Sequence, residues 1–182
     1  MNTQNSKTLI IVYVAICAAL MAICSWISIP TVVPFTLQTF AVFLAIGILG
    51  GKFGTLAVLV YILLGAVGIP VFSGFKGGIG SLIGPTGGYI IGFIFSALVM
   101  WLIEKLAGRK LVILGISMVI GLLVCYAFGT AWFMVVYGKA NGAISLASAL
   151  GMCVIPFIIP DIIKIALALL LAKILRREIH IN

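Results

Sequence analysis

The stretch Pro160-Asp161-Ile162-Ile163-Lys164 places two opposite charges inside an otherwise apolar run from about Met152 to Leu175. Residues three positions apart on a helix lie on the same face, so Asp161 and Lys164 can reach the same small volume. Charges at membrane depth are costly, and such residues normally face the interior of a helix bundle and mark a ligand or ion path. We therefore interpret this pair as the centre of a binding site.

Two structural explanations of the pair stay open. Asp161 and Lys164 can simply neutralise each other, or Asp161 can stabilise the first turn of a helix that begins after Pro160. The second explanation leaves Lys164 without a role, because a cation near a helix N-terminus is unfavourable.

Composition indicates the class of protein. Hydrophobic residues make up 64% of the 182-residue chain and charged residues 8%, whereas soluble domains carry roughly 25% charged residues. So few charges cannot cover a soluble protein of this length, and the chain is predicted to be an all-α integral membrane protein. At roughly 20 residues per span, the length allows about six transmembrane helices in one bundle. We treat this bundle as a single transmembrane domain over residues 1–182.

The apolar runs and their interruptions predict where the six helices lie. The predicted ranges are about 8–29, 37–50, 55–67, 88–106, 111–136 and 156–176. The first run is too long for a signal peptide and lacks a small-x-small cleavage site, so it is predicted to be a retained span. A tight turn over 50–54, a polar turn over 138–141 and an apolar approach segment over 143–155 connect the later helices. The glycine-rich stretch 68–87 is predicted to be an external loop that folds back on the bundle, since loops of this length are often lids.

Basic residues predict the orientation of the bundle. In a six-span arrangement only Lys76 and Lys139 fall on one side, and eight basic residues fall on the other. These eight are Lys7, Lys52, Lys105, Arg109, Lys110, Lys173, Arg176 and Arg177. The positive-inside rule places the side with eight, and with it both termini, in the cytoplasm. The net charge of +8 does not indicate a nucleic-acid partner, because the basic residues lie at the ends of apolar runs and form no patch.

The sequence argues against several activities. Cys17, Cys24, Cys125 and Cys153 lie singly in apolar runs, which predicts neither a disulfide framework nor a metal site. The single histidine, His180, lies in the C-terminal tail, and the chain has no HExxH motif or paired intramembrane carboxylates, so an enzyme is not expected. No GxxxxGK motif is present, so ATP hydrolysis is not expected either. One Asp–Lys pair also makes no ring or filter of the kind that channels use.

Further candidate residues come from three segments. Ala15, Ala18, Ala19 and Ala22 form two overlapping AxxxA spacings, which suit either packing inside the bundle or docking of another protein. Gln38 has a donor and an acceptor, and it can either cap its helix or contact a ligand. The glycines of Gly84-Pro-Thr-Gly-Gly-Tyr89 allow a close backbone approach, either to a ligand or to a neighbouring helix.

Three motifs together resemble those of one known family. In chain order they are Pro34-Phe-Thr-Leu-Gln-Thr39, Gly84-Pro-Thr-Gly-Gly-Tyr89 and Pro160-Asp161-Ile-Ile-Lys164. The whole chain resembles the BioY family, the biotin-binding S components of energy-coupling-factor (ECF) vitamin transporters in prokaryotes. One departure is that the family often has Pro-Gly-Asp before the lysine, whereas Pro160 here directly precedes Asp161.

The resemblance implies a vitamin-binding subunit of the prokaryotic cell membrane, without catalytic activity or a resident cofactor. It implies that transport needs an ECF transmembrane coupling protein and two cytoplasmic ATPases. It also favours the docking interpretation of the alanine stripe, with the coupling protein as the partner.

The chemistry of biotin fits the charged pair. Asp161 can accept hydrogen bonds from the ureido N–H groups, and charge-assisted bonds of this kind are strong. Lys164 can donate either to the ureido oxygen or to the carboxylate of the tail, and both options stay open. Tyr89, Gln38, Thr86 and Trp26 are the candidates for walls and secondary hydrogen bonds of a mostly apolar pocket. An S component for riboflavin or thiamine is the alternative.

Overall fold

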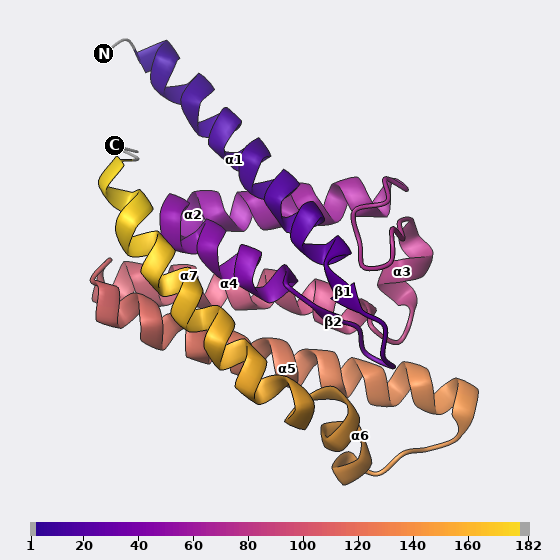
Figure 1. Cartoon of the computed structure of the whole chain (residues 1–182). Helices are drawn as coiled ribbons and strands as arrows, with labels where there is room; N and C mark the ends of the chain where they lie inside the picture. Colours follow the sequence, from indigo (N-terminus) through magenta and orange to yellow (C-terminus); the bar gives the residue numbers. More distant parts are fainter. Residues whose placement is uncertain (1–2, 179–182) are drawn as a thin grey trace.

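The structure, a computed structural model, describes residues 3–178 and is built mostly from helices (Figure 1). Its elements are α1 (Thr3–Trp26), β1 (Ser28–Ile29), β2 (Phe35–Thr36), α2 (Gln38–Ala66), α3 (Ile79–Ile83), α4 (Gly87–Ala107), α5 (Leu111–Asn141), α6 (Leu146–Cys153), η1 (Ile155–Phe157) and α7 (Ile158–Glu178). Five helical stretches of the described chain are long and apolar enough to cross a membrane, namely 7–26, 38–66, 87–107, 111–141 and 146–176. The expectation of a mostly helical membrane protein is therefore confirmed.

Helix α2 is folded back on itself at Gly50. This residue has φ 81° and ψ 169°, outside helical geometry, and glycine adopts such a conformation without a steric penalty. A Cβ built on Gly54 would lie only 2.5 Å from the Cα of Ile46, so the two arms of α2 pack directly against each other. The arms correspond to the helices predicted over 37–50 and 55–67. The turn is shorter than predicted, since Gly51–Gly54 already belong to the second arm.

Two predicted helix ends are wrong. Helix α1 ends at Trp26, and not at Ile29, because the following residues leave the helix and pair in an antiparallel register, Ser28 with Thr36 and Ile29 with Phe35. Helix α5 continues through the predicted turn over 138–141 and ends before Gly142, whose φ of 88° suits a helix C-terminus.

The connections also contain more structure than predicted. The 68–87 stretch holds the short helix α3 and an isolated bridge between Phe72 and Lys76. The approach segment over 143–155 folds into α6, and α7 begins at Ile158, so Pro160 lies in its first turn, where the missing N–H has no cost.

Small residues bring α4 and α5 into close contact. A Cβ on Gly88 would lie 2.2 Å from the Cβ of Trp132, and one on Gly92 would lie 3.2 Å from Sγ of Cys125. A Cβ on Gly121 would lie 2.6 Å from Oγ of Ser96. Close approach through small residues is a common way for helices to associate in lipid. Gly88 and Gly92 therefore serve helix packing. This is one of the two roles expected for the glycines in and next to the Gly84–Tyr89 motif, the other being close approach to a ligand.

The turn of α2 and the ends of α4 and α7 meet at one end of the molecule, which we call the Gly50 end. The Glu104 carboxylate accepts a hydrogen bond from the backbone N–H of Gly51 (2.8 Å) and lies 3.4 Å from Nε of Arg109. Arg176 donates to the backbone oxygens of Gly47 and Arg109. These contacts tie three segments together at this end.

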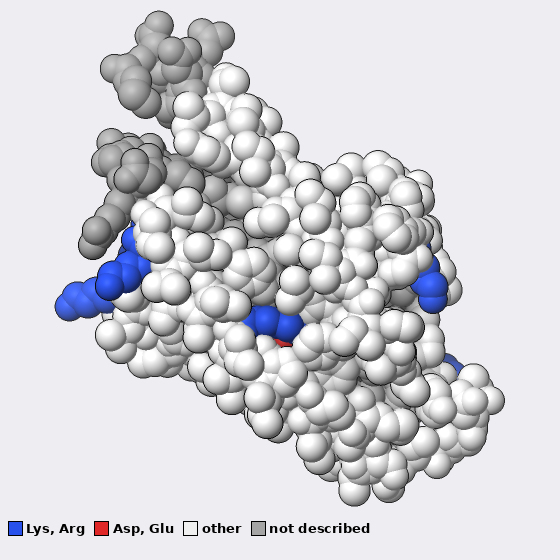
Figure 2. Space-filling view, in the orientation of Figure 1, with Lys and Arg blue, Asp and Glu red and all other residues white. Residues whose placement is uncertain are grey.

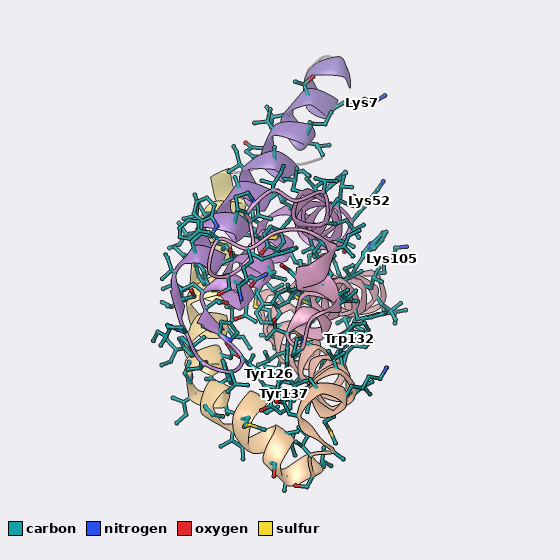
Figure 3. The ribbon with its side chains drawn as sticks, turned by 90° about the vertical axis from the view of Figure 1, so that its right-hand side faces the viewer. Lys7, Lys52, Lys105, Tyr126, Trp132 and Tyr137 are labelled. Carbon is teal, nitrogen blue, oxygen red and sulfur yellow. The ribbon has the colours of Figure 1, made fainter. Side chains whose placement is uncertain are left out.

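Charge is sparse on one face of the molecule. Figure 2 shows a face on which Lys and Arg colour only a few small areas. In Figure 3, Lys7, Lys52 and Lys105 lie in the upper part of the view and Tyr126, Trp132 and Tyr137 in the lower part. His180, which was predicted to lie in the C-terminal tail, falls outside the part of the chain that the structure describes.

Candidate ligand-binding site

A cavity of about 530 Å³ lies among the helices, away from the Gly50 end. Its walls include residues from the start of α2, the 72–86 segment, α4, α5, α6, η1 and α7. Helix α1 contributes none. Pockets for small molecules commonly measure about 300–1,000 Å³. This cavity has the size of such a pocket.

Asp161 and Lys164 form an ion pair in the wall of this cavity. Lys164 Nζ lies 2.8 Å from Asp161 Oδ1, and the two residues are only 3% and 5% exposed. Both are also lining residues of the cavity. The pair thus neutralises itself, as one structural explanation holds, and it also faces a space that a ligand can fill.

Three donors surround the Asp161 carboxylate. Thr39 Oγ1 donates to Oδ1 at 3.1 Å, the Tyr126 hydroxyl donates to Oδ2, and Lys164 supplies the third contact. Lys164 also donates to Thr39 Oγ1 at 3.3 Å, and its Nζ lies 4.3 Å from the centre of the Phe35 ring. An ammonium group has three N–H donors. Within the described residues two of these find hydrogen-bond acceptors, so one is left for a ligand.

Gln38, Tyr89 and Thr86 also line the cavity, as expected for site residues. The Gln38 amide donates to the Tyr61 hydroxyl at 2.8 Å, and its side chain does not cap α2. The Tyr89 hydroxyl lies 2.9 Å from Thr130 Oγ1. The structure therefore brings five of the six predicted site residues to one cavity.

Trp26 is the exception and is removed from the candidate site. Its indole N–H donates to the backbone oxygen of Pro70 at 2.8 Å, and its ring stacks on Phe75 with centroids 5.1 Å apart. The side chain is 37% exposed and is not part of the cavity wall. Because Trp26 ends α1, its ring reaches the outside of the 68–76 segment and not the interior.

The alanine stripe of α1 is divided between two environments. Ala18 and Ala22 are buried inside the bundle, with exposed fractions of 2% and 6%. Ala15 and Ala19 are exposed on the outer surface of the same helix. The burial assigns Ala18 and Ala22 to internal packing and corrects the expectation that all four form one docking face.

Several polar residues of the cavity, among them Thr39, Tyr126 and Lys76, were not among the predicted site residues. Thr39 belongs to the Pro34–Thr39 motif, so the motif itself was a signal for it. Tyr126 lies in an apolar run, and Lys76 lies in a glycine-rich loop, where the local sequence gives no sign of a binding role.

The site is suited to binding rather than to chemical conversion. It combines one self-neutralised pair, a few hydroxyl and amide groups, and apolar walls that include Ile90, Phe93 and Phe157. Such a pocket holds a small molecule that has a polar group and an apolar body. Fold and site together define a helical membrane protein with a buried small-molecule site.

The chain belongs to the BioY family, whose sequence profile matches residues 1–180. A protein of Thermotoga maritima named biotin transporter BioY is 44% identical over 160 residues, which cover 87% of this chain and 90% of the relative. Biotin transporter BioY2 of Lactococcus lactis is 34% identical over 182 residues, covering 98% and 97%. These relatives are transporters and not enzymes, which confirms the expected class of protein.

A solved structure shows the same fold. It is described as the S-component for biotin from an ECF-type ABC transporter, and it matches this chain with a TM-score of 0.85 at 28% identity. The match covers 97% of this chain and 95% of the solved one.

Proposed function

We propose that this protein is the biotin-binding S component of an ECF vitamin transporter. It captures biotin from outside the cell, and an ECF transmembrane coupling protein with two cytoplasmic ATPases drives uptake. The observation that carries the proposal is the buried Asp161–Lys164 pair in the wall of a ligand-sized cavity. The names of the relatives and of the solved structure support biotin as the ligand.

The polar groups of the cavity match the ureido end of biotin. A carboxylate offers about four lone-pair sites, and Asp161 uses three of them for Thr39, Tyr126 and Lys164. The remaining site can accept one ureido N–H, and the free N–H of Lys164 can donate to the ureido oxygen. Gln38, Thr86 and Tyr89 line the same cavity and supply secondary contacts. Biotin is the transported ligand here, and the proposal includes no resident cofactor.

Titration of the purified protein with biotin, riboflavin and thiamine tests this function. Trp132 is a suitable reporter, because its indole N–H donates at 3.0 Å to the backbone oxygen of Gly84, a residue of the cavity wall. We expect a saturable fluorescence change with biotin alone, which Trp132→Phe removes and Trp26→Phe leaves in place. Calorimetry checks the affinity independently of fluorescence. Saturable binding of riboflavin or thiamine in place of biotin would favour an S component for another vitamin.

We propose six spans with both termini in the cytoplasm of a prokaryotic cell. The two arms of α2 count as separate spans, because the chain reverses at Gly50. The Gly50 end then faces the cytoplasm, since basic residues gather on the inner side of membrane proteins. The 68–87 segment and the Lys139 end of α5 are external in this arrangement.

Cysteine labelling tests the orientation. In a Cys-free background, Lys7→Cys and Arg177→Cys should be shielded from an impermeant thiol reagent in intact cells, whereas Lys76→Cys should be labelled. Permeabilised cells, in which all three should react, serve as the control. Labelling of either terminal cysteine from outside the intact cell would contradict the proposed topology.

A further inference from the structure

Two lysines at the Gly50 end have no acidic partner in the part of the chain that the structure describes. Lys52 and Lys105 are exposed, and their ammonium groups take part in neither of the two ion pairs found there. The carboxylate next to them, that of Glu104, is already engaged. It accepts the backbone N–H of Gly51 and lies 3.4 Å from Nε of Arg109. The two lysines therefore carry positive charge that is available to a molecule outside the protein.

The packing of α2 on α4 places these lysines on neighbouring segments. Gly51 donates its N–H to Glu104 at 2.8 Å, and Lys52 and Lys105 are the residues that follow these two. A Cβ on Gly51 would lie 2.5 Å from the Cα of Trp101, so the two backbones are in direct contact. Figure 3 shows Lys52 and Lys105 one above the other, both directed away from the bundle on the same side. One strip of surface thus carries both ammonium groups.

Each of the two lysines lies beside an aromatic ring. Lys105 Nζ is 4.8 Å from the centre of the Trp101 ring, and Lys52 Nζ is 5.4 Å from that of Phe53. Such cation–π contacts hold an ammonium group in place while leaving its N–H groups available. Tryptophan is enriched where membrane proteins meet the lipid headgroups. The strip is therefore suited to lie at the depth of the lipid phosphates.

Exposed apolar side chains continue from each lysine along its own helix. Residues three, four or seven positions apart share a helix face, and both lysines begin such a face. The stripe on α2 consists of Leu56, Leu59 and Leu63, and the stripe on α4 of Leu102, Leu98 and Phe95. A positive charge above an apolar stripe matches a lipid with an anionic headgroup, because the acyl chains can lie along the stripe. A soluble phosphate would make no use of it.

We propose that Lys52 and Lys105 bind the headgroup phosphate of an anionic phospholipid, whose acyl chains lie along these two stripes. Anionic lipids are abundant in the cytoplasmic leaflet, and basic sites between helices on that side bind their headgroups. The inference uses the proposed topology, in which the Gly50 end is cytoplasmic, and does not depend on what occupies the cavity. The bound lipid holds the turn of α2 and the end of α4 at headgroup depth.

Quenching of Trp101 by brominated lipids tests this site. The double change Trp26→Phe, Trp132→Phe leaves Trp101 as the single tryptophan of the chain. The protein is reconstituted into phosphatidylcholine vesicles that contain the same small fraction of either brominated phosphatidylglycerol, which is anionic, or brominated phosphatidylcholine, which is zwitterionic. At low salt we expect the anionic lipid to quench Trp101 more strongly. The difference should shrink at high salt, because exposed charges are screened.

Matched lysine variants show whether the preference comes from this strip. Lys52→Gln and Lys105→Gln should each lower the relative binding constant of the anionic lipid on the order of fivefold, and Lys105→Arg should retain it. Lys139→Gln is the control, because it removes an exposed cation in the last turn of α5, and it should change nothing. A second measurement keeps the natural tryptophans. In native mass spectrometry, wild-type protein and Lys139→Gln should retain phosphatidylglycerol adducts that the double variant Lys52→Gln, Lys105→Gln loses.

Four results would overturn the inference. The two lipids could quench Trp101 equally, or the preference could survive in the double lysine variant. It could fall as much in Lys139→Gln as in Lys105→Gln, which would indicate a diffuse attraction without a site. Lastly, the lysine variants could keep the lipid preference but lose co-purification with the ATPase-bearing module, which would make the strip a protein contact. Biotin calorimetry stays separate from these outcomes, because a protein without affinity for biotin would contradict the proposed function and leave the lipid result as measured.

Discussion

Asp161→Asn and Lys164→Gln should each weaken biotin binding by about 1.5–3 kcal/mol or more, the usual scale for hydrogen bonds to charged groups. Each single change also leaves one charge buried without its partner, which commonly costs about 3–5 kcal/mol of stability. The reason lies in the burial of the pair, since the Asp161 side chain is only 4% exposed and the Lys164 side chain 6%. Both ligand binding and thermal unfolding should therefore suffer in the single variants.

The double variant Asp161→Asn, Lys164→Gln separates the two effects. It contains no unpaired buried charge, so much of the stability lost in either single variant should return. Binding should not return, because the charged donor and acceptor for the ligand are both absent. Calorimetry and thermal unfolding of all four proteins form a complete cycle. If the double variant recovered binding as well as stability, the pair would serve only the fold. If Asp161→Asn bound biotin as the wild type does, Asp161 would not belong to the binding site.

Ala19→Leu should abolish assembly with the coupling protein, and hence uptake, while purified protein still binds biotin. Ala19 is exposed on α1, so a larger side chain there does not disturb the core but fills a surface that we propose to be a docking face. Ala15→Leu should act in the same way. Ala18→Leu should instead destabilise the protein, since Ala18 is 2% exposed and overpacking a core costs about 1–3 kcal/mol.

Ala127→Leu is the matched control for this prediction, because Ala127 is an exposed alanine on α5. It should leave biotin binding, co-purification with the ATPase-bearing module and uptake unchanged. If Ala19→Leu lost binding but still assembled, Ala19 would belong to the internal packing of the bundle. If it assembled and transported normally, the docking face would lie elsewhere.

The helices could be predicted from the sequence, but several of their ends could not. Hydropathy shows where the apolar segments lie, and the glycines at 50–54 predict the turn at which α2 reverses. The end of α1 depends on pairing between Ser28–Ile29 and Phe35–Thr36, a contact that helical periodicity does not contain. The extension of α5 shows the opposite error, since a polar stretch ending at Asn141 stays helical until Gly142.

The sequence singled out residues of the cavity wall where a residue is unusual in its own segment. Asp161 and Lys164 stand out because charge is rare in an apolar run. Tyr126 reaches Asp161 from another helix, 35 positions away, and Thr39 does so from 122 positions away. Only packing brings such residues together, and the direction of the Trp26 ring likewise depends on where α1 ends.

The close packing of α4 on α5 has a consequence for how the protein matures. Only Gly108–Lys110 separate the two helices, and structures dominated by contacts between neighbouring segments form fastest. We expect this helical hairpin to assemble early, as soon as both helices have entered the bilayer. The cavity needs α2, α4, α5 and α7 together, so it closes only after the last helix has been synthesised. A chain that stops before α7 would therefore contain a well-packed hairpin but would not bind the ligand. Cellular quality control would have to recognise such a chain by the helix surface that α7 normally covers.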